Sequence, residues 1–189
     1  MAARLGKLKL GKGGGAFVKR RLLWLPQQDV AREADFCPLP ELIEGRELWL
    51  GMVVSHHDGT ILAQEIIEQP PTVNDLATLL AYSMERPVTD DRHGRPKKFY
   101  LRDNPEWEEL FPHLAQLKIQ VVVTEDLPQW DEAVAEFIQY MKAWRSKYGQ
   151  SKTISESELG RRDEMLDLTI TAILFPPNRR DRQRKQRKL

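Results

Sequence analysis

The sequence lacks the features that mark several classes of protein. Its 189 residues include a single cysteine, Cys37, which excludes an internal disulfide framework and a cysteine-based zinc cluster. The longest apolar runs are four residues, such as 22–25 (LLWL), whereas a membrane-spanning helix needs about 20. There is no Asn-x-Ser/Thr sequon, and no apolar signal-peptide core follows the basic N-terminal residues. These absences predict a protein of a reducing, cytoplasmic compartment with no membrane partner.

Charge is distributed unevenly along the chain. Residues 1–21 hold seven basic side chains and no acid, and residues 178–189 hold seven basic side chains against Asp181. Together these two segments carry a charge of +13. Because the net charge of the whole chain is +1, residues 22–177 carry −12. Dense basic ends are typical of nucleic-acid contact through counterion release, and equally of solvated tails or of tails that dock on the acidic body. The candidate nucleic-acid-binding residues are Lys7, Lys9, Lys12, Lys19, Arg20, Arg21, Arg179, Arg180, Arg182, Arg184, Lys185, Arg187 and Lys188.

The length favours one domain, and hydrophobic residues make up 41% of the chain, an ordinary globular fraction. Composition predicts a basic flexible arm over residues 1–16 and a folded domain over 17–149. A C-terminal extension over 150–177 and a basic tail over 178–189 follow. The pattern leaves open whether residues 165–175 form a helix or a strand.

The strongest local signal is a β-hairpin. Residues 47–55 and 60–67 are β-rich runs joined through Asp58-Gly59, which supplies the positive φ angles of a type I′ turn. An apolar stripe at helical spacing predicts a helix over 72–86, with Thr72 as its N-cap. Residues 17–25 are predicted as the first strand and 27–45 as a long connection. Further strands are expected at 97–102 and 119–124. Between these strands we expect a helix that Asn104 caps and Pro112 bends or divides, and after them a long helix at 131–147.

The predicted order is strand, strand, strand, helix, strand, helix, strand, helix. It favours an α/β fold with a three-layer mixed sheet, in which an antiparallel meander is followed by parallel strands. This order is similar to that of the ribonuclease H-like fold of retroviral-type integrase cores and transposases. The stretches that carry the resemblance are GRELWLGMVVSHHDGTILAQEII, TVNDLATLLAYSMERP, KKFYLRDNPEW and LAQLKIQVVV.

The chain also resembles an uncharacterised bacterial domain family that is frequent in cyanobacteria. The matching patterns are FYLRD at residues 99–103 and LPQWDEA at residues 127–133. This resemblance implies a type of domain and no particular activity.

The integrase resemblance implies three or four carboxylates that would hold two divalent metals. The family places the first carboxylate inside the first strand, and residues 17–25 contain no acid. Asp103 matches the second position, and Asp131, Glu132 and Glu136 lie where the third would be. The sequence therefore predicts no metal, no cofactor and no catalytic residue, with Asp103 as the one weak candidate and a turn or cap role preferred for it.

The other motifs in the sequence are weaker evidence for a functional site. Residues 6–12 match the start of a phosphate-binding loop, but Gly13 replaces the magnesium-binding hydroxyl and too few residues precede Gly6 for a strand. His56-His57-Asp58 is interpreted as a polar hairpin tip rather than a metal site, because adjacent strand residues face opposite sides. The reactivity of Cys37, predicted in a loop, is left open. Trp107 and Trp130, near helix starts, are candidates for exposed stacking rings.

The sequence therefore favours a non-catalytic ribonuclease H-like domain that binds RNA or DNA through basic termini. Two alternatives stand beside it: a protein-interaction module that works through its acidic body, and a metal-dependent nuclease with a rearranged carboxylate site. The sequence does not distinguish RNA from DNA, nor does it give an oligomeric state or a pathway.

Overall fold

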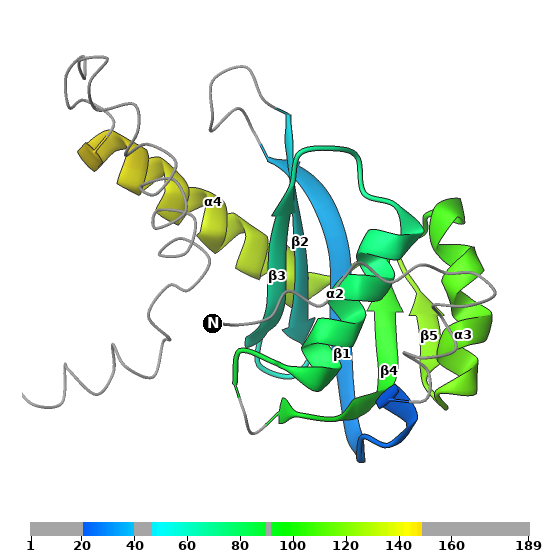
Figure 1. The fold of residues 1–189 in the computed structure, drawn as a ribbon. Coiled ribbons are helices and arrows are strands. Elements are labelled where there is room, and N and C mark those ends of the chain that lie inside the picture. Colours follow the sequence, from blue (N-terminus) through cyan, green and yellow to red (C-terminus); the bar gives the residue numbers. More distant parts are fainter. Residues whose placement is uncertain (1–20, 40–46, 90–91, 149–189) are drawn as a thin grey trace, which may run out of the picture. The chain divides into compact units, whose positions relative to one another are not determined.

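The computed structural model describes residues 21–39, 47–89 and 92–148. The chain divides into two units, Met1–Gln139 and Tyr140–Leu189. The first unit contains a five-stranded sheet with helices, the mixed α/β fold that the sequence predicted (Figure 1). The predicted arm at 1–16, the extension at 150–177, with its open choice at 165–175, and the tail at 178–189 lie outside the described residues.

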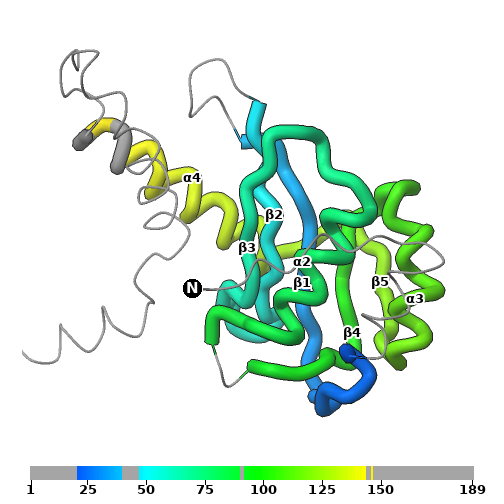
Figure 2. The backbone as a smooth tube through the Cα atoms, in the orientation of Figure 1, coloured from blue at the N-terminus to red at the C-terminus, as the bar shows by residue number. Residues whose placement is uncertain are grey.

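The sheet has the strand order β3-β2-β1-β4-β5. β1 pairs antiparallel with β2, as β2 does with β3, whereas the β1–β4 and β4–β5 pairs are parallel. β1 is therefore the central strand, and the colours of Figure 2 follow the chain outwards from it on both sides. The strands are β1 (Gln27–Leu39), β2 (Leu48–Ser55), β3 (Ile61–Ile67), β4 (Arg95–Leu101) and β5 (Gln120–Val123).

The central strand is not the segment that the sequence indicated. Residues 21–23 are helical, and the Trp24 and Leu25 N–H groups donate to the carbonyls of Arg21 and Leu22 (3.3 and 3.1 Å). The strand predicted over 17–25 is therefore wrong in its described part. The predicted connection over 27–45 is wrong from Gln27 to Leu39, which form β1. The apolar residues around Leu22 suggested a strand, whereas the real strand was hidden by charged side chains that find partners inside the fold.

β2 and β3 form the predicted hairpin around Asp58-Gly59. Gly59 has a φ of 64°, a left-handed conformation that glycine adopts without strain. Asp58 does not share it, because Lys118 is the only non-glycine residue with positive φ in the described ranges. The turn is therefore not of type I′. Instead the Gly59 N–H donates to the Ser55 carbonyl and the Ser55 N–H to the Thr60 carbonyl, both at 2.9 Å.

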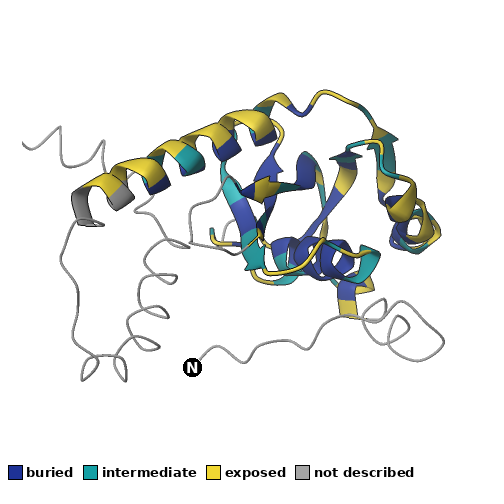
Figure 3. Cartoon of the chain, turned by 90° about the horizontal axis from the view of Figure 1, so that it is seen from above, coloured by how far each residue is buried: buried dark blue, intermediate teal, exposed yellow. Residues whose placement is uncertain are grey.

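The helix α2 (Val73–Glu85) has the N-terminus that its sequence predicted. The Thr72 side chain accepts a hydrogen bond from the Asp75 N–H (3.4 Å), and the Asp75 carboxylate accepts one from the Thr72 N–H (3.0 Å). This reciprocal capping box satisfies two donors that the first turn would leave open. Leu76, Leu80 and Met84 are at most 1% exposed, so the apolar stripe faces the sheet (Figure 3).

The segment between β4 and β5 is divided, as Pro112 predicted. It forms a 3-10 helix, η2 (Pro105–Leu110), followed by a short helix, α3 (Phe111–Gln116). The Asn104 side chain accepts from the Glu106 N–H (3.0 Å), and Pro112 lies in the first turn of α3, where its missing donor costs nothing. Trp107, buried to 1% exposure, anchors this segment in the core.

The last described helix, α4 (Pro128–Tyr148), begins on the face of the sheet opposite α2, so the first unit has three layers (Figure 1). Between the sheet and α2, η2 and α3 lies the main core, which includes Ala34, Val53 and Phe99. On the other face, Leu50, Met52 and Val54 of β2 are fully buried. The first turns of α4 contribute Trp130, Ala133, Val134 and Phe137, each at most 8% exposed.

Gly51 is required by close packing rather than by its backbone angles. It pairs with Phe36 across β1 and β2. A Cβ atom at Gly51 would lie 2.7 Å from the ζ carbon of the Phe36 ring, well inside contact distance. That ring packs towards Trp107, with 6.3 Å between the centroids. The absent side chain thus makes room for an aromatic contact in the main core.

Candidate functional site

β1 carries buried charges on both faces of the sheet. Arg32, Glu33 and Asp35 are 1%, 0% and 6% exposed. Because successive strand residues face opposite sides, Arg32 points to the α2 face while Glu33 and Asp35 point to the α4 face. A buried charge costs several kcal/mol unless partners compensate it. The partners of these three residues therefore identify the chemically distinctive part of the molecule.

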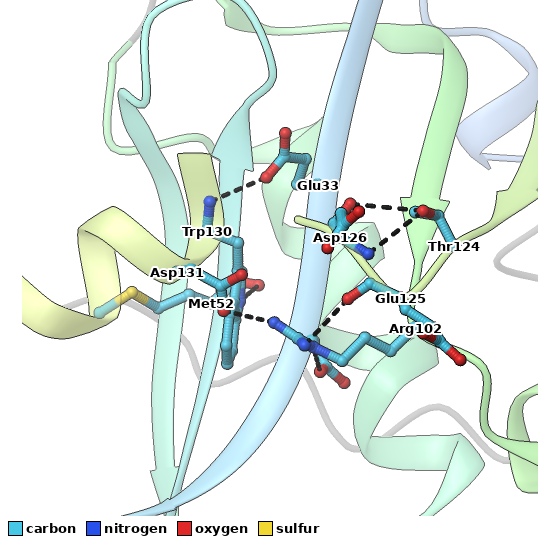
Figure 4. Close-up of polar contacts among 9 residues, drawn as sticks. Glu33, Met52, Arg102, Thr124, Glu125, Asp126, Trp130 and Asp131 are labelled. Carbon is cyan, nitrogen blue, oxygen red and sulfur yellow. Dashed lines mark hydrogen bonds and ion pairs between the residues drawn. The ribbon is translucent and has the colours of Figure 1, made fainter. Parts of the chain in front are cut away.

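Asp35, Arg102 and Asp131 form what we term the Arg102 cluster. The Arg102 Nε lies 2.8 Å from Asp35 Oδ2, and its Nη2 pairs with Asp131 Oδ1. Its Nη1 donates to the Glu125 carbonyl at 3.1 Å. The guanidinium carbon lies 5.3 Å from the centroid of the Trp130 ring, a cation–π distance (Figure 4). One fixed cation thus joins a carboxylate of β1 to a carboxylate in the first turn of α4.

Burial is the largest influence on the pKa of Asp35 and on that of the nearby Cys37. It raises the pKa of Asp35 above its usual value, although the Phe36 N–H and the charge and hydrogen bond of Arg102 act in the opposite direction. Burial, and then the charge of Asp35, raise the pKa of the Cys37 thiol to about 11. Cys37 lies in β1 rather than in the predicted loop. It is therefore protonated at neutral pH and a weak nucleophile, which answers the question that the sequence left open.

These residues do not fit the two-metal site that the integrase resemblance implies. β1 contains Glu33 and Asp35, so the prediction that the first strand lacks an acid is wrong. Asp103 follows β4 as predicted, but it is exposed and outside the Arg102 cluster. In the described ranges, no three His, Cys, Asp or Glu side chains converge closely enough to hold a metal ion. Arg102 instead supplies the positive charge between Asp35 and Asp131.

The sequence placed two further acids near the third position. Glu132 and Glu136 are exposed on α4. Of the three candidates, Asp131 is the one that forms an ion pair of the Arg102 cluster.

Glu33 joins three elements through its two oxygens. Its Oε1 lies 2.6 Å from His56 Nδ1, and its Oε2 accepts from the Trp130 N–H at 2.8 Å. Trp130 is in the first turn of α4, so a carboxylate from the sheet satisfies a donor at a helix N-terminus. The His56 ring also stacks on Tyr100, with centroids 4.6 Å apart and planes inclined by 23°. His56 is thus a partner of Glu33, whereas Asp58 pairs with Arg92 (2.6 Å).

Arg32 makes a different kind of network on the α2 face. Its Nη1 donates to the Ser83 carbonyl (2.6 Å) and hydroxyl (3.3 Å). Its Nη2 donates to the carbonyls of Arg92 (2.8 Å) and Gly94 (3.0 Å). Burial, and then the charge of Arg92, lower the pKa of Arg32 to about 10, so it remains charged at neutral pH. These bonds tie the end of α2 and the approach to β4 to the central strand.

Of the candidate nucleic-acid-binding residues, only Arg21 is described. Its Nε lies 2.9 Å from Glu85 Oε1. The others, at 7–20 and 179–188, lie outside the described residues. Trp107 and Trp130 are 1% and 3% exposed, so the expectation of exposed rings there is wrong. Among the tryptophans whose burial is described, Trp24 is the exposed one, at 87%.

The sequence could have revealed the Arg102 cluster through one signal. Acids two residues apart, as at Glu33 and Asp35, share a face if the segment is a strand. That signal was lost once residues 27–45 were interpreted as a connection. Arg102 itself was quoted only as part of the FYLRD pattern, with no role.

Comparisons with known proteins place this fold. The family model "Domain of unknown function (DUF6930)" matches residues 18–138. The structure is similar to the integrase catalytic core domain of HTLV-2, solved with magnesium, at 12% identity and a TM-score of 0.54. That match covers 82% of this chain and 89% of the integrase chain.

A simian T-cell lymphotropic virus intasome, solved with the PP2A regulatory subunit B56 gamma, is similar at 12% identity with a TM-score of 0.54. The match covers 84% of this chain and about half (52%) of the viral one. At these identities the likeness concerns the fold alone. A comparison with curated proteins gave no match. Within the described ranges, no helix is long and apolar enough to cross a membrane.

Proposed function

Because the chain belongs to the family described as Domain of unknown function (DUF6930), and shares the fold of integrase cores, we propose that it is a non-catalytic binding domain for RNA or DNA. In this proposal the integrase-like core is a scaffold, and the basic termini contact the phosphate backbone. The observation that carries the proposal is Arg102, which binds Asp35 and Asp131 together.

Arg102 cannot do the work of a metal ion between these carboxylates. A catalytic divalent ion lowers the pKa of a bound water and stabilises the leaving oxygen through open coordination positions. A guanidinium group offers only N–H donors and keeps its charge at all working pH values. Here all three nitrogens of Arg102 already have acceptors, on Asp35, Asp131 and the Glu125 carbonyl. The cluster therefore supports a structural role for these acids rather than hydrolysis.

The charge distribution supports the nucleic-acid half of the proposal. The terminal segments carry +13 and the body −12, so the ends of the chain attract phosphate most strongly. Binding of this kind follows from the release of counterions and carries little sequence information. We therefore expect affinity without strong sequence preference.

The test is fluorescence anisotropy of labelled duplex DNA and of single-stranded RNA, titrated with the full chain over a range of salt concentrations. We expect log affinity to fall linearly with log salt, by about 0.9 for each duplex phosphate neutralised. Deleting residues 178–189 flattens that slope and weakens binding to all sequences alike. A matched control replaces the seven basic residues of 178–189 by Gln at constant length, and gives the same loss. Binding unchanged by both variants would contradict the proposal.

One observation favours a protein-interaction function, although through an apolar site rather than through the acidic body that the sequence indicated. Trp24 is 87% exposed and Leu23 beside it is 43% exposed. Exposed aromatic residues are enriched at protein interfaces. Photo-crosslinking from position 24 in cells tests this alternative: recovery of one specific protein, lost when Leu23→Ser is combined with the crosslinker, would support it. Failure to crosslink any protein would count against it.

A further inference from the structure

The α4 face of the sheet continues beyond the part that α4 contacts. Trp130 covers Met52 and Glu33, to which its indole and backbone N–H groups donate (3.1 and 2.8 Å). Next to that contact, the His56 N–H donates to the Ala31 carbonyl (3.1 Å). In the register of the sheet, Ala31 of β1 lies opposite Lys98 of β4, and Lys98 lies opposite Gln120 of β5. In parallel register, Glu33 pairs with Tyr100 and Tyr100 with Val122.

Residues paired across strands point to the same face, so these positions form two adjacent rows on one surface. His56, Lys98 and Gln120 are exposed, and Ala31, Tyr100 and Val122 are half-buried. We name this the Tyr100 surface; it consists of His56, Lys98, Tyr100, Gln120 and Val122.

The centre of the Tyr100 surface is a fixed aromatic pair. His56 stacks on Tyr100 with one ring face, at 4.6 Å between centroids, while its Nδ1 lies 2.6 Å from the fully buried Glu33. The His56 side chain is nevertheless 43% exposed. The small Ala31 lies between His56 and Lys98 in the row and leaves room above the sheet. A ring that is held from below and open to solvent is a preorganised stacking platform.

The surroundings of this pair suit a polyanion with planar groups. Lys98 is beside the pair and supplies a positive charge for a phosphate. Gln120 supplies an amide with both donors and an acceptor for the edge of a base. Aromatic residues on a β-sheet surface, flanked by basic and amide side chains, are a general way to bind unpaired bases.

We propose that the Tyr100 surface binds single-stranded nucleic acid, with one base stacked on the His56–Tyr100 pair and a phosphate at Lys98. This inference rests on the proposed nucleic-acid function and adds a site on the core that the basic termini alone would not require. Single strands are favoured over duplexes because paired bases hide the ring faces that stacking needs.

The experiment measures anisotropy of short labelled oligo(dT) and oligo(U) with the full chain. Tyr100→Leu removes the ring that holds His56 in its stacking position, so we expect binding to weaken roughly 5- to 100-fold, the range for loss of one stacked base, whereas Tyr100→Phe retains binding. Lys98→Ala reduces the salt slope by about 0.7, the value for one single-strand phosphate. The matched control is Lys97→Ala: Lys97 is the neighbouring residue of β4, points to the other face and pairs with Asp29 (3.0 Å). We expect it to bind as wild type.

A second readout locates the contact directly. An oligonucleotide that contains bromouracil, crosslinked to the chain by light, should attach at His56 or Tyr100, and mass spectrometry identifies the attached residue. A cooperative thermal transition in each variant confirms that the variant is folded. If Tyr100→Leu and Lys98→Ala bind as wild type while deletion of 178–189 weakens binding, the assignment of a binding site to the Tyr100 surface is wrong and the proposed function stands. If the wild-type chain binds no nucleic acid, both are wrong. Equal losses for duplex and single strands would also overturn the stacking model.

Discussion

Arg32 and Arg102 occupy opposite faces of the sheet and are held by opposite kinds of partner. Arg32 donates to three carbonyls and a hydroxyl and is 1% exposed. Arg102 binds two carboxylates and one carbonyl, and its side chain is 33% exposed. A buried cation with neutral acceptors fixes the backbone that it contacts. A half-exposed cation between acids neutralises charge at the edge of the fold.

The comparison shows how one residue type serves two purposes. The Arg32 network closes the loop between α2 and β4, and its removal leaves backbone carbonyls without donors. The Arg102 cluster occupies the region in which the integrase resemblance would require metal ligands, and its removal leaves acids without a counterion. The first effect appears mainly in stability and the second mainly in the electrostatics of the cluster.

The largest expected effect is that of Arg32→Met. This variant leaves the carbonyls of Ser83, Arg92 and Gly94 without their donor, at about 1–3 kcal/mol for each buried acceptor, so we expect a loss of at least about 3 kcal/mol. Urea unfolding followed by circular dichroism measures it. Arg32→Lys serves as a control that keeps the charge without the planar fork. A loss below about 1 kcal/mol for Arg32→Met would remove the distinction between the two networks.

The second largest loss of stability is expected for Glu33→Gln. The amide can still accept from the Trp130 N–H, but it loses the charge that holds His56, so we expect a loss of about 1–2 kcal/mol. Glu33→Ala should cost more, because it also uncaps α4. Urea unfolding of the two variants checks the order. A smaller loss for Glu33→Ala than for Glu33→Gln would show that this carboxylate does not stabilise the start of α4.

Much of the fold was predictable from local sequence. The hairpin at Asp58-Gly59, the capping box at Thr72 and the division near Pro112 depend on residues a few positions apart, which sequence patterns record. β1 could not be predicted in this way. Its charged residues resemble those of a loop until their distant partners are known: Ser83 for Arg32, His56 for Glu33 and Arg102 for Asp35.

The same reason explains the errors at the candidate site. Asp103 was placed correctly after β4, yet its side chain lies outside the Arg102 cluster. Asp35 was overlooked because the strand that contains it, β1, was interpreted as a connection. The role of Arg102 depends on contacts with residues 67 positions before it and 29 after it, which no local pattern contains.

A moderate effect is expected for Arg102→Ala. Asp131 is half-exposed and screened by solvent, so its pair contributes at most about 1 kcal/mol. The Asp35 side chain is only 9% exposed and would lose its counterion. We expect a total loss of about 1–2 kcal/mol, partly restored by Asp35→Asn in the same chain. A double-mutant cycle over Arg102 and Asp35 measures the coupling, and a coupling of zero would contradict the ion pair.

The smallest expected effect is a pH dependence at the hairpin. Burial alone would raise the pKa of Asp58, but hydrogen bonds from Ser55, Thr60 and Arg92 outweigh it and lower the pKa to about 2. A carboxyl with a lowered folded pKa stabilises the fold above its unfolded pKa of about 3.9, and this stabilisation is lost as pH falls towards 2. Thermal unfolding between these pH values should show a shallower decline for Asp58→Asn than for wild type. Identical declines would contradict the assignment.

The most direct test of the account is a nuclease assay of the purified full chain on single-stranded RNA, single-stranded DNA and duplex DNA in Mg²⁺ or Mn²⁺. Because Arg102 fills the space between Asp35 and Asp131, and Asp103 lies apart from both, we predict the same absence of specific cleavage for wild type and for Asp103→Asn. Metal-dependent cleavage by the wild-type chain that Asp103→Asn abolishes would contradict the central claim that this integrase-like core is non-catalytic.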